Sequence, residues 1–306
     1  MEDLLLKSEG ISKAFGGVQA LDKIQFELRR GEVHALVGEN GAGKSTYIKI
    51  LSGVYYKDEG TTVFDGKEID FKSNLEAREH GVGMVPQLID LAPKLTVAEN
   101  IYMGMYPRTK MGFVDWKKLY RDAEKVAATF GMEDMVRKHV EQLGTGHRQL
   151  IEILKALVFD TKIIAFDEPT AALSDEETKG LFHLIGKLRQ QNISIIYVSH
   201  RLDELFQIAD RVSVLKDGKY VGTRNVAEVS KDEIVSMMVG RELDLFGEDT
   251  RKKKGRDEVV FEVKDLKSEN NVNGVNFQVK AGEIVGCFGM VGSGRTETVM
   301  AVFGED

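Results

Sequence analysis

The chain has 306 residues, of which 42% are hydrophobic and 30% charged, and its 31 Gly and 4 Pro residues fit a folded α/β protein and exclude a disordered chain. The formal net charge of −7 argues against nucleic acid as the main partner, because proteins that bind phosphate backbones normally carry an excess of Lys and Arg. Cys287 is the only cysteine, which excludes an intrachain disulfide. No apolar run approaches the roughly 20 residues that span a bilayer, so we expect membrane contact only through partner subunits.

The first predicted elements are two strands, a glycine-rich loop and a helix. Apolar and polar residues alternate in Ile24–Leu28, as in a half-buried strand, whereas Val33–Val37 is nearly all apolar, as in a buried one. Apolar residues then recur at helical spacing, and Gly53 is placed to end that helix. The order strand, glycine loop, helix is therefore present.

The loop Gly38–Ser45 has the pattern of a phosphate-binding loop, in which spaced glycines precede Lys and Ser. Small residues let the chain curl closely, so that backbone N–H groups and the positive end of the helix dipole surround the phosphates. We expect Lys44 to neutralise the β- and γ-phosphates and Ser45 to offer its hydroxyl to Mg²⁺.

Residues 91–142 are predicted to form a helical insertion, in which one apolar stripe indicates a helix over Trp116–Phe130. The later predicted elements are, in chain order, a helix near Leu150–Val158, a buried strand over Lys162–Phe166, a helix capped by Ser174 and Glu177, a buried strand over Ile193–Val198 and a hairpin that turns at Asp217-Gly218. Alternating strands and helices favour an α/β fold with a mainly parallel sheet covered on both faces.

Polar residues follow the buried strands at the edge where parallel sheets bind ligands. Asp167 and Glu168 end one strand, and we expect Asp167 to hold Mg²⁺ through a water ligand and Glu168 to act as general base. His200 follows the next core strand, where we expect it to contact the γ-phosphate. Gln87 lies where the helical insertion begins.

An internal repeat divides the chain, because Val275–Glu297 aligns without gaps on Ile24–Thr46. The predicted organisation is a first domain over residues 1–242, a charged linker over 243–257 and an N-terminal fragment of a second, similar domain over 258–306. That last piece is too short to bury a core of its own, so we expect the chain to be truncated from a longer tandem protein.

The phosphate loop, Gln87, the run Asp167–Ser174 and Ser199-His200 occur in the order and spacing of ATP-binding cassettes, and the resemblance covers practically the whole chain. The runs VGENGAGKST, LTVAENIYMG, FDEPTAALS, YVSHRLDE and VGREL are similar to the monosaccharide importers of the ribose and galactose type, which also carry two cassettes in one chain. The resemblance implies a P-loop NTPase of the ABC type, with a mainly parallel core, an antiparallel β subdomain and a helical insertion subdomain.

The resemblance also implies roles for single residues. The implied ATP-binding residues are Phe15, Gly38, Glu39, Asn40, Gly41, Ala42, Gly43, Lys44, Ser45, Thr46 and Gln87. Phe15 matches the aromatic residue on which adenine stacks, although a phenylalanine at this position could equally pack in the core. The implied Mg²⁺ ligands are Ser45, Gln87 and, through water, Asp167, while Glu168 matches the catalytic base and His200 the γ-phosphate switch.

Two loops that the family uses between cassettes are also implied. The signature loop comprises Leu143, Gly144, Thr145, Gly146, His147, Arg148 and Gln149, and the D-loop comprises Ala171, Ala172, Leu173 and Ser174. The chain departs from the family pattern at Gly144, which replaces the signature serine, and at Arg295, which replaces the phosphate-loop lysine of the second unit. The residues of that degenerate second loop are Gly289, Gly292, Gly294, Arg295 and Thr296.

The implied function is the ATP-binding and ATP-hydrolysing subunit of an ABC importer for a monosaccharide, with ATP and Mg²⁺ as cofactors. The implied partners are membrane permease subunits and, through them, an extracytoplasmic solute-binding protein, which places the chain at the cytoplasmic face of the cell membrane. Three alternatives stay open: a nucleoside importer of the same group, a soluble tandem cassette protein acting on ribosomes or DNA, and a regulatory module that binds ATP without turnover. Glu168 and His200 argue against the last of these.

Overall fold

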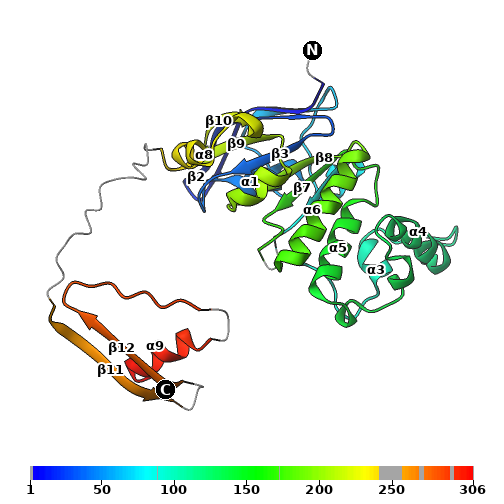
Figure 1. Cartoon of the computed structure of the whole chain (residues 1–306). Helices are drawn as coiled ribbons and strands as arrows, with labels where there is room; N and C mark the ends of the chain where they lie inside the picture. The colour runs from blue at the N-terminus through cyan, green and yellow to red at the C-terminus, as the bar shows by residue number, and fades with distance from the viewer. Residues whose placement is uncertain are drawn as a thin grey trace. The chain divides into compact units, whose positions relative to one another are not determined.

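The structure is a computed structural model that describes residues 3–87, 89–171, 173–240, 257–268, 272–289 and 293–305. The chain divides into two compact units, Met1–Leu243 and Asp244–Asp306, which are described separately (Figure 1). In the described residues, no helix is both long enough and apolar enough to cross a membrane.

A six-stranded sheet with the order β10-β9-β3-β8-β7-β6 forms the centre of the first unit. Its strands are β3 (Val33–Val37), β6 (Val82–Val85), β7 (Ile163–Asp167), β8 (Ser194–Val198), β9 (Arg211–Lys216) and β10 (Lys219–Asn225). The first five are parallel to one another, and β10 is antiparallel to β9. Strands β3, β7 and β8 are buried along their whole length, as their apolar sequences predict. The predicted α/β fold with a mainly parallel core is confirmed.

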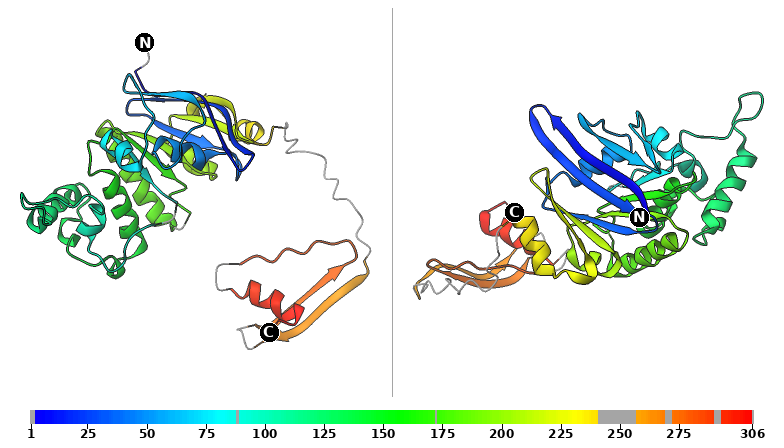
Figure 2. Two further views of the ribbon diagram at one scale, coloured as in Figure 1. Left: turned by 180° about the vertical axis from the view of Figure 1, so that it is seen from behind. Right: turned by 90° about the horizontal axis from the view of Figure 1, so that it is seen from above.

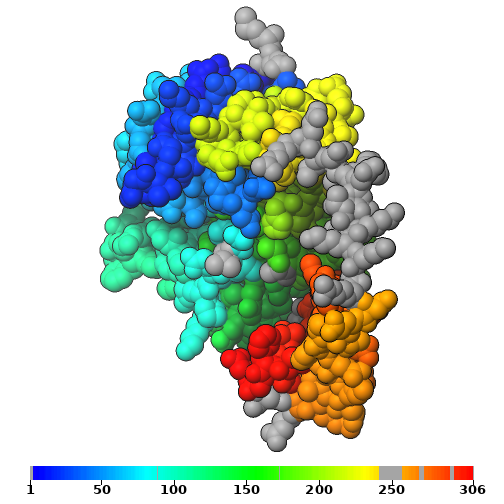
Figure 3. Space-filling view, turned by 90° about the vertical axis from the view of Figure 1, so that its left-hand side faces the viewer, coloured from blue at the N-terminus to red at the C-terminus, as the bar shows by residue number. Residues whose placement is uncertain are grey.

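A second, antiparallel sheet has the order β2-β1-β4-β5, with β1 (Leu4–Phe15), β2 (Val18–Arg29), β4 (Glu59–Phe64) and β5 (Lys67–Glu68). Strand β2 is longer than the predicted Ile24–Leu28, because bulges let the β1–β2 pair twist around the core. The backbone N–H of Asp22 donates to the carbonyl of Gly218 at 2.7 Å, which joins β2 to the predicted Asp217-Gly218 turn. Figure 3 shows the dark blue β1 and β2 residues beside the yellow end of the first unit.

Helices cover both faces of the central sheet. They are α1 (Lys44–Leu51), α2 (Asn74–Glu79), α5 (Thr145–Ala156), α6 (Asp175–Gln190), α7 (Leu202–Ile208) and α8 (Lys231–Val239), and a 3-10 turn covers Val226–Glu228. Ser174 and Glu177 form the predicted capping box at the start of α6, whose apolar stripe packs on the sheet beside β8.

A helical part lies beyond α5 and α6 as seen from the sheet (Figures 1 and 2). It contains α3 (Val97–Ile101), α4 (Trp116–Ala128) and 3-10 turns at Glu133–Met135 and Val140–Gln142. Helix α4 ends two residues before the predicted Phe130, because the chain turns at Gly131 with φ 67°. The apolar core of this part also includes Ile151 and Leu154 of α5, so it continues beyond the predicted boundary at residue 142.

Helix α5 begins at Thr145, earlier than the predicted Leu150, because extended Gly144 already turns the chain into the helix. Residues Thr145 to Gln149 of the implied signature loop therefore form its first turns, and Leu143 and Gly144 precede them.

The second unit consists of the antiparallel pair β11 (Val259–Lys267) and β12 (Asn273–Lys280) and of helix α9 (Arg295–Phe303). The repeat aligns its residues 284–288 with β3, yet these residues form no strand, and Ile284 and Phe288 are almost fully exposed. In the first unit, β3 is hydrogen-bonded to β8 and β9, which both come later in the chain. The described residues of the second unit include no strands at the corresponding positions.

Candidate active site at the carboxyl edge of the sheet

The predicted phosphate loop lies between β3 and α1, and two of its positions admit only glycine. A Cβ atom on Gly38 would collide with the carbonyl oxygen of Leu215. Gly43 has φ 98°, and a Cβ atom there would lie 2.7 Å from the carbonyl oxygen of Ala20. Because Gly43 caps α1 without a side chain, the first backbone N–H groups of the helix are open to an anion.

Lys44 holds its ammonium group at this loop. Its Nζ donates to the carbonyl oxygens of Gly38 at 2.8 Å and Glu39 at 2.9 Å. Burial lowers the pKa of Lys44, and the negative charges of Glu168 and Asp167 act against that shift. A buried ammonium group beside open backbone N–H groups attracts polyanions such as a triphosphate.

Ser45 and Asp167 form a pair of oxygen ligands beside the loop. The Ser45 hydroxyl donates to Oδ1 of Asp167 at 2.9 Å, although the two residues come from α1 and the end of β7. Burial raises the pKa of Asp167, while the hydrogen bond from Ser45 lowers it. A hydroxyl and a desolvated carboxylate at one point fit Mg²⁺, which prefers oxygen ligands and completes its shell with water and phosphate oxygens.

Gln87, Glu168 and His200 meet at the same edge, because they follow the neighbouring strands β6, β7 and β8. Nε2 of Gln87 donates to Oε2 of Glu168 at 3.2 Å, and Nδ1 of His200 lies 3.3 Å from Oε1 of the same carboxylate. Glu168 has φ 47°, a left-handed conformation that a non-glycine residue rarely adopts. Its backbone N–H donates to the carbonyl of Val198 at 3.0 Å, which holds this turn against β8.

A cavity of about 400 Å³ connects these groups. Its lining residues are Ala20, Asn40, Gly41, Gly43, Lys44, Ser45, Thr46, Gln87 and Glu168. Backbone N–H donors, one cation and two potential Mg²⁺ ligands thus face a single space, with the carboxylate of Glu168 at its side. This arrangement can bind a polyphosphate and polarise a water molecule next to it.

Phe15 does not line this cavity. Its side chain is 42% exposed beside the β1–β2 turn, where the ring contacts Tyr55 edge-on with centroids 5.2 Å apart, and Nζ of Lys13 lies 5.4 Å from its centroid. The ring is therefore neither core packing nor a wall of the phosphate cavity.

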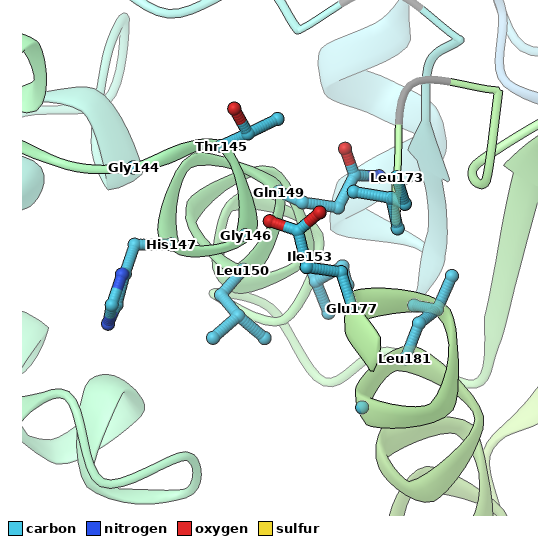
Figure 4. Close-up of a pocket in the computed structure, with 11 residues that line it drawn as sticks. Gly144, Thr145, Gly146, His147, Gln149, Leu150, Ile153, Leu173, Glu177 and Leu181 are labelled. Carbon is cyan, nitrogen blue, oxygen red and sulfur yellow. The ribbon is translucent and has the colours of Figure 1, made fainter. Parts of the chain in front are cut away.

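The signature residues border a second cavity of about 380 Å³ between α5 and α6. Figure 4 shows Glu177 of α6 beside the first turns of α5, and Leu173 of the implied D-loop lines the same space. No side chain caps α5, because Gly144 stands at its N-cap. Ala172 lies outside the described residues.

The described end of the degenerate loop resembles the first phosphate loop at the helix start. Gly294 has φ 82° and caps α9, which begins at Arg295 as α1 begins at Lys44. A Cβ atom on Gly289 would collide with the hydroxyl of Ser293. Gly292 lies outside the described residues.

Comparison with known proteins shows which family has this arrangement of site residues. A profile of the ABC transporter family matches residues 21–171, the span from β2 to the start of the implied D-loop. The chain therefore carries an ATP-binding cassette. The first unit also resembles the crystal structure of the ADP conformation of an ATP-binding cassette of an ABC transporter, with a TM-score of 0.68 and 25% identity over 78% of this chain and 99% of that one.

Two curated relatives of this chain are named as ATP-binding proteins of sugar import. A putative ribose/galactose/methyl galactoside import ATP-binding protein of Burkholderia ambifaria is 46% identical over 99% of this chain and 59% of its own length. The ribose import ATP-binding protein of Clostridium tetani is 46% identical over 99% of this chain and 60% of its own length. The chain thus spans about three fifths of the length of these relatives.

Proposed function

We propose that this chain binds and hydrolyses ATP to energise a membrane importer for a monosaccharide, at the cytoplasmic face of the cell membrane. The observation that carries the proposal is the convergence of Lys44, Ser45, Gln87 and Glu168 on one cavity, with Asp167 bonded to Ser45 beside it. The names of the sugar-import relatives support the monosaccharide.

In the proposed reaction, the phosphate loop and Lys44 bind the triphosphate, and Ser45, Gln87 and, through water, Asp167 would hold Mg²⁺. When bound, Mg²⁺ neutralises charge on the phosphate oxygens as the γ-phosphoryl group leaves. Glu168 accepts a proton from the water that attacks the γ-phosphorus, while the bond to the β–γ bridging oxygen breaks and ADP leaves. Gln87 and His200 orient that carboxylate through the 3.2 Å and 3.3 Å contacts.

We also propose that the signature residues at the start of α5 face the nucleotide of another cassette. Gly144 has no hydroxyl to offer there, and the Arg295 loop lacks the compact ammonium group of Lys44. A composite site built from these two loops is altered on both faces. We therefore expect the Lys44 loop to carry most of the hydrolysis in the assembled transporter.

The permease subunits require a docking place that senses the nucleotide. A groove of about 330 Å³ lies beside the segment that carries Gln87, between the sheet core and the helical part. Its lining residues are Lys49, Val54, Asn74, Arg78, Met84, Pro86, Asp90, Glu152, Lys155 and Ala156. Oε1 of Glu152 accepts from the backbone N–H of Asp90 at 2.9 Å, which ties this segment to α5. We propose that the groove receives a cytoplasmic segment of the permease.

Crosslinking tests this docking place. In a Cys287→Ser background, we expect a cysteine at Ile89 to crosslink to the permease subunits, because Ile89 lies between Gln87 and the groove residue Asp90. The matched control is a cysteine at Glu228, which is exposed and follows β10. Strand β10 lies at the other end of the strand order from β6, which Ile89 follows. Equal crosslinking from both positions would contradict the proposed groove. Leu88, the other candidate position from the sequence, lies outside the described residues.

The solute class is tested with the transporter assembled from the full-length protein, its permease and its binding protein. We expect ribose or galactose to stimulate ATP hydrolysis, and nucleosides to leave it at the basal rate. Stimulation by nucleosides alone would replace the sugar with the nucleoside alternative. Hydrolysis that responds to ribosomes or DNA and not to any permease would overturn the importer assignment.

A further inference from the structure

Glu204 is a buried carboxylate outside the nucleotide cavity. It lies in the first turn of α7, four residues after His200, and is 4% exposed. Its neighbours Leu202 and Leu205 belong to an apolar cluster on the face of the sheet. A carboxylate in such surroundings is costly unless hydrogen bonds satisfy it, so its partners indicate why it is there.

Four side chains satisfy this carboxylate. Thr170 Oγ1 lies 2.8 Å from Oε1 and 2.9 Å from Oε2, and Tyr197 Oη lies 2.8 Å from Oε2. Ser199 Oγ lies 3.1 Å from Oε2, and a guanidinium nitrogen of Arg201 lies 2.9 Å from Oε1. Burial, together with the negative charge of Glu204, raises the pKa of Tyr197, so the phenol remains a donor. All four partners therefore donate to a charged acceptor.

These donors come from both sides of the proposed catalytic pair. Thr170 follows Glu168 by two residues, while Ser199 and Arg201 flank His200. One carboxylate therefore ties the turn after β7 to the turn after β8, at the point where His200 lies 3.3 Å from Glu168. Tyr197 differs from the other donors, because its backbone is held within β8 by the sheet.

We propose that Glu204 is a positioning residue for ATP hydrolysis, which fixes the separation between Glu168 and His200 through Thr170 and Ser199. Glu204 lines no part of the nucleotide cavity and so acts only through these two turns. A displacement of about 1 Å between reacting groups lowers a rate by roughly 100-fold, so a rigid link of this kind has a measurable effect on turnover. The inference rests on the proposed ATP hydrolysis.

Single hydroxyl deletions give the sharpest test, because they remove one bond each from the same carboxylate. In the assembled transporter, we expect Thr170→Val and Ser199→Ala to lower kcat by roughly 10-fold or more while the Kd for Mg-ATP stays within about 2-fold. Tyr197→Phe is the matched control, since it removes a bond of 2.8 Å to Glu204 that reaches neither turn. We expect its kcat to stay within about 2-fold of the wild type. An equal loss of kcat in all three variants would show a merely structural role.

A double-mutant cycle tests whether Glu204 acts through His200. We expect Glu204→Leu to lower kcat strongly in the wild-type background and to have little further effect in a His200→Ala background, because coupled residues are not additive. Glu204→Gln keeps one acceptor oxygen and should retain more activity than the leucine variant. Independent, additive losses would overturn the proposal, and the hydroxyl variants test it even if Glu204→Leu does not fold. A wild-type transporter without ATP hydrolysis would instead refute the proposed function itself.

Discussion

Lys44→Ala is expected to abolish tight binding of Mg-ATP, raising its Kd by on the order of 100-fold or more. Among the residues that line the cavity, Lys44 supplies the one side-chain cation, and its carbonyl contacts hold the ammonium group at the loop. Without it, no side-chain cation among the residues that line the cavity meets the phosphate charge. Isothermal titration of the chain with Mg-ATP measures the change.

The matched control for this variant is Lys187→Ala. Lys187 is an exposed lysine in the last turn of α6, so its replacement changes the net charge by the same amount away from the loop. We expect the control to bind Mg-ATP as the wild type does. Unchanged affinity in the Lys44→Ala variant would remove the loop from nucleotide binding.

Glu168→Gln is expected to leave nucleotide binding intact and to lower turnover by on the order of 100-fold or more, the usual effect of losing a positioned base. The amide keeps the size of the side chain and can still bond with Gln87. It no longer accepts a proton from water. Single-turnover hydrolysis in the assembled transporter, with the Kd measured in parallel, separates the two effects.

Glu32→Gln is the control for a lost carboxylate. Glu32 is buried and pairs with Arg211 at the amino ends of the strands, away from the nucleotide cavity. We expect this variant to lose stability, because Arg211 loses its charged partner, and to keep the single-turnover rate of the folded protein. Wild-type turnover by Glu168→Gln would show that another group accepts the proton.

The sequence predicts the phosphate loop well because the features that form it are close together in the chain. A buried strand, glycines at positions that reject a Cβ atom and a helix start are all adjacent in the chain. The central strands were equally predictable, since β7 and β8 are apolar throughout. Their order in the sheet was not predicted, because it depends on pairings between strands that are distant in the chain.

Other parts of the site depend on contacts that no local pattern records. The contact between Gln87 and Glu168 requires the register of β6 against β7, and the exposed ring of Phe15 depends on the twist of the β1–β2 hairpin. The sequence did not predict a role for Glu204, because a carboxylate in the first turn of a helix usually faces water. Its four partners become visible only when two neighbouring turns are folded.

The connectivity of β3 has a consequence for how the protein is made. This central strand pairs on both sides with β8 and β9, and the contact from His34 to Ser213 spans 179 residues of chain. At roughly 5–20 residues per second, a ribosome needs about 10–35 s to synthesise that interval. The apolar Val33–Val37 run has neither neighbour until β8 emerges and lacks β9 until the end of that interval, so the nascent chain requires shielding from aggregation. Spontaneous refolding is expected to be slow for a unit dominated by such distant pairings.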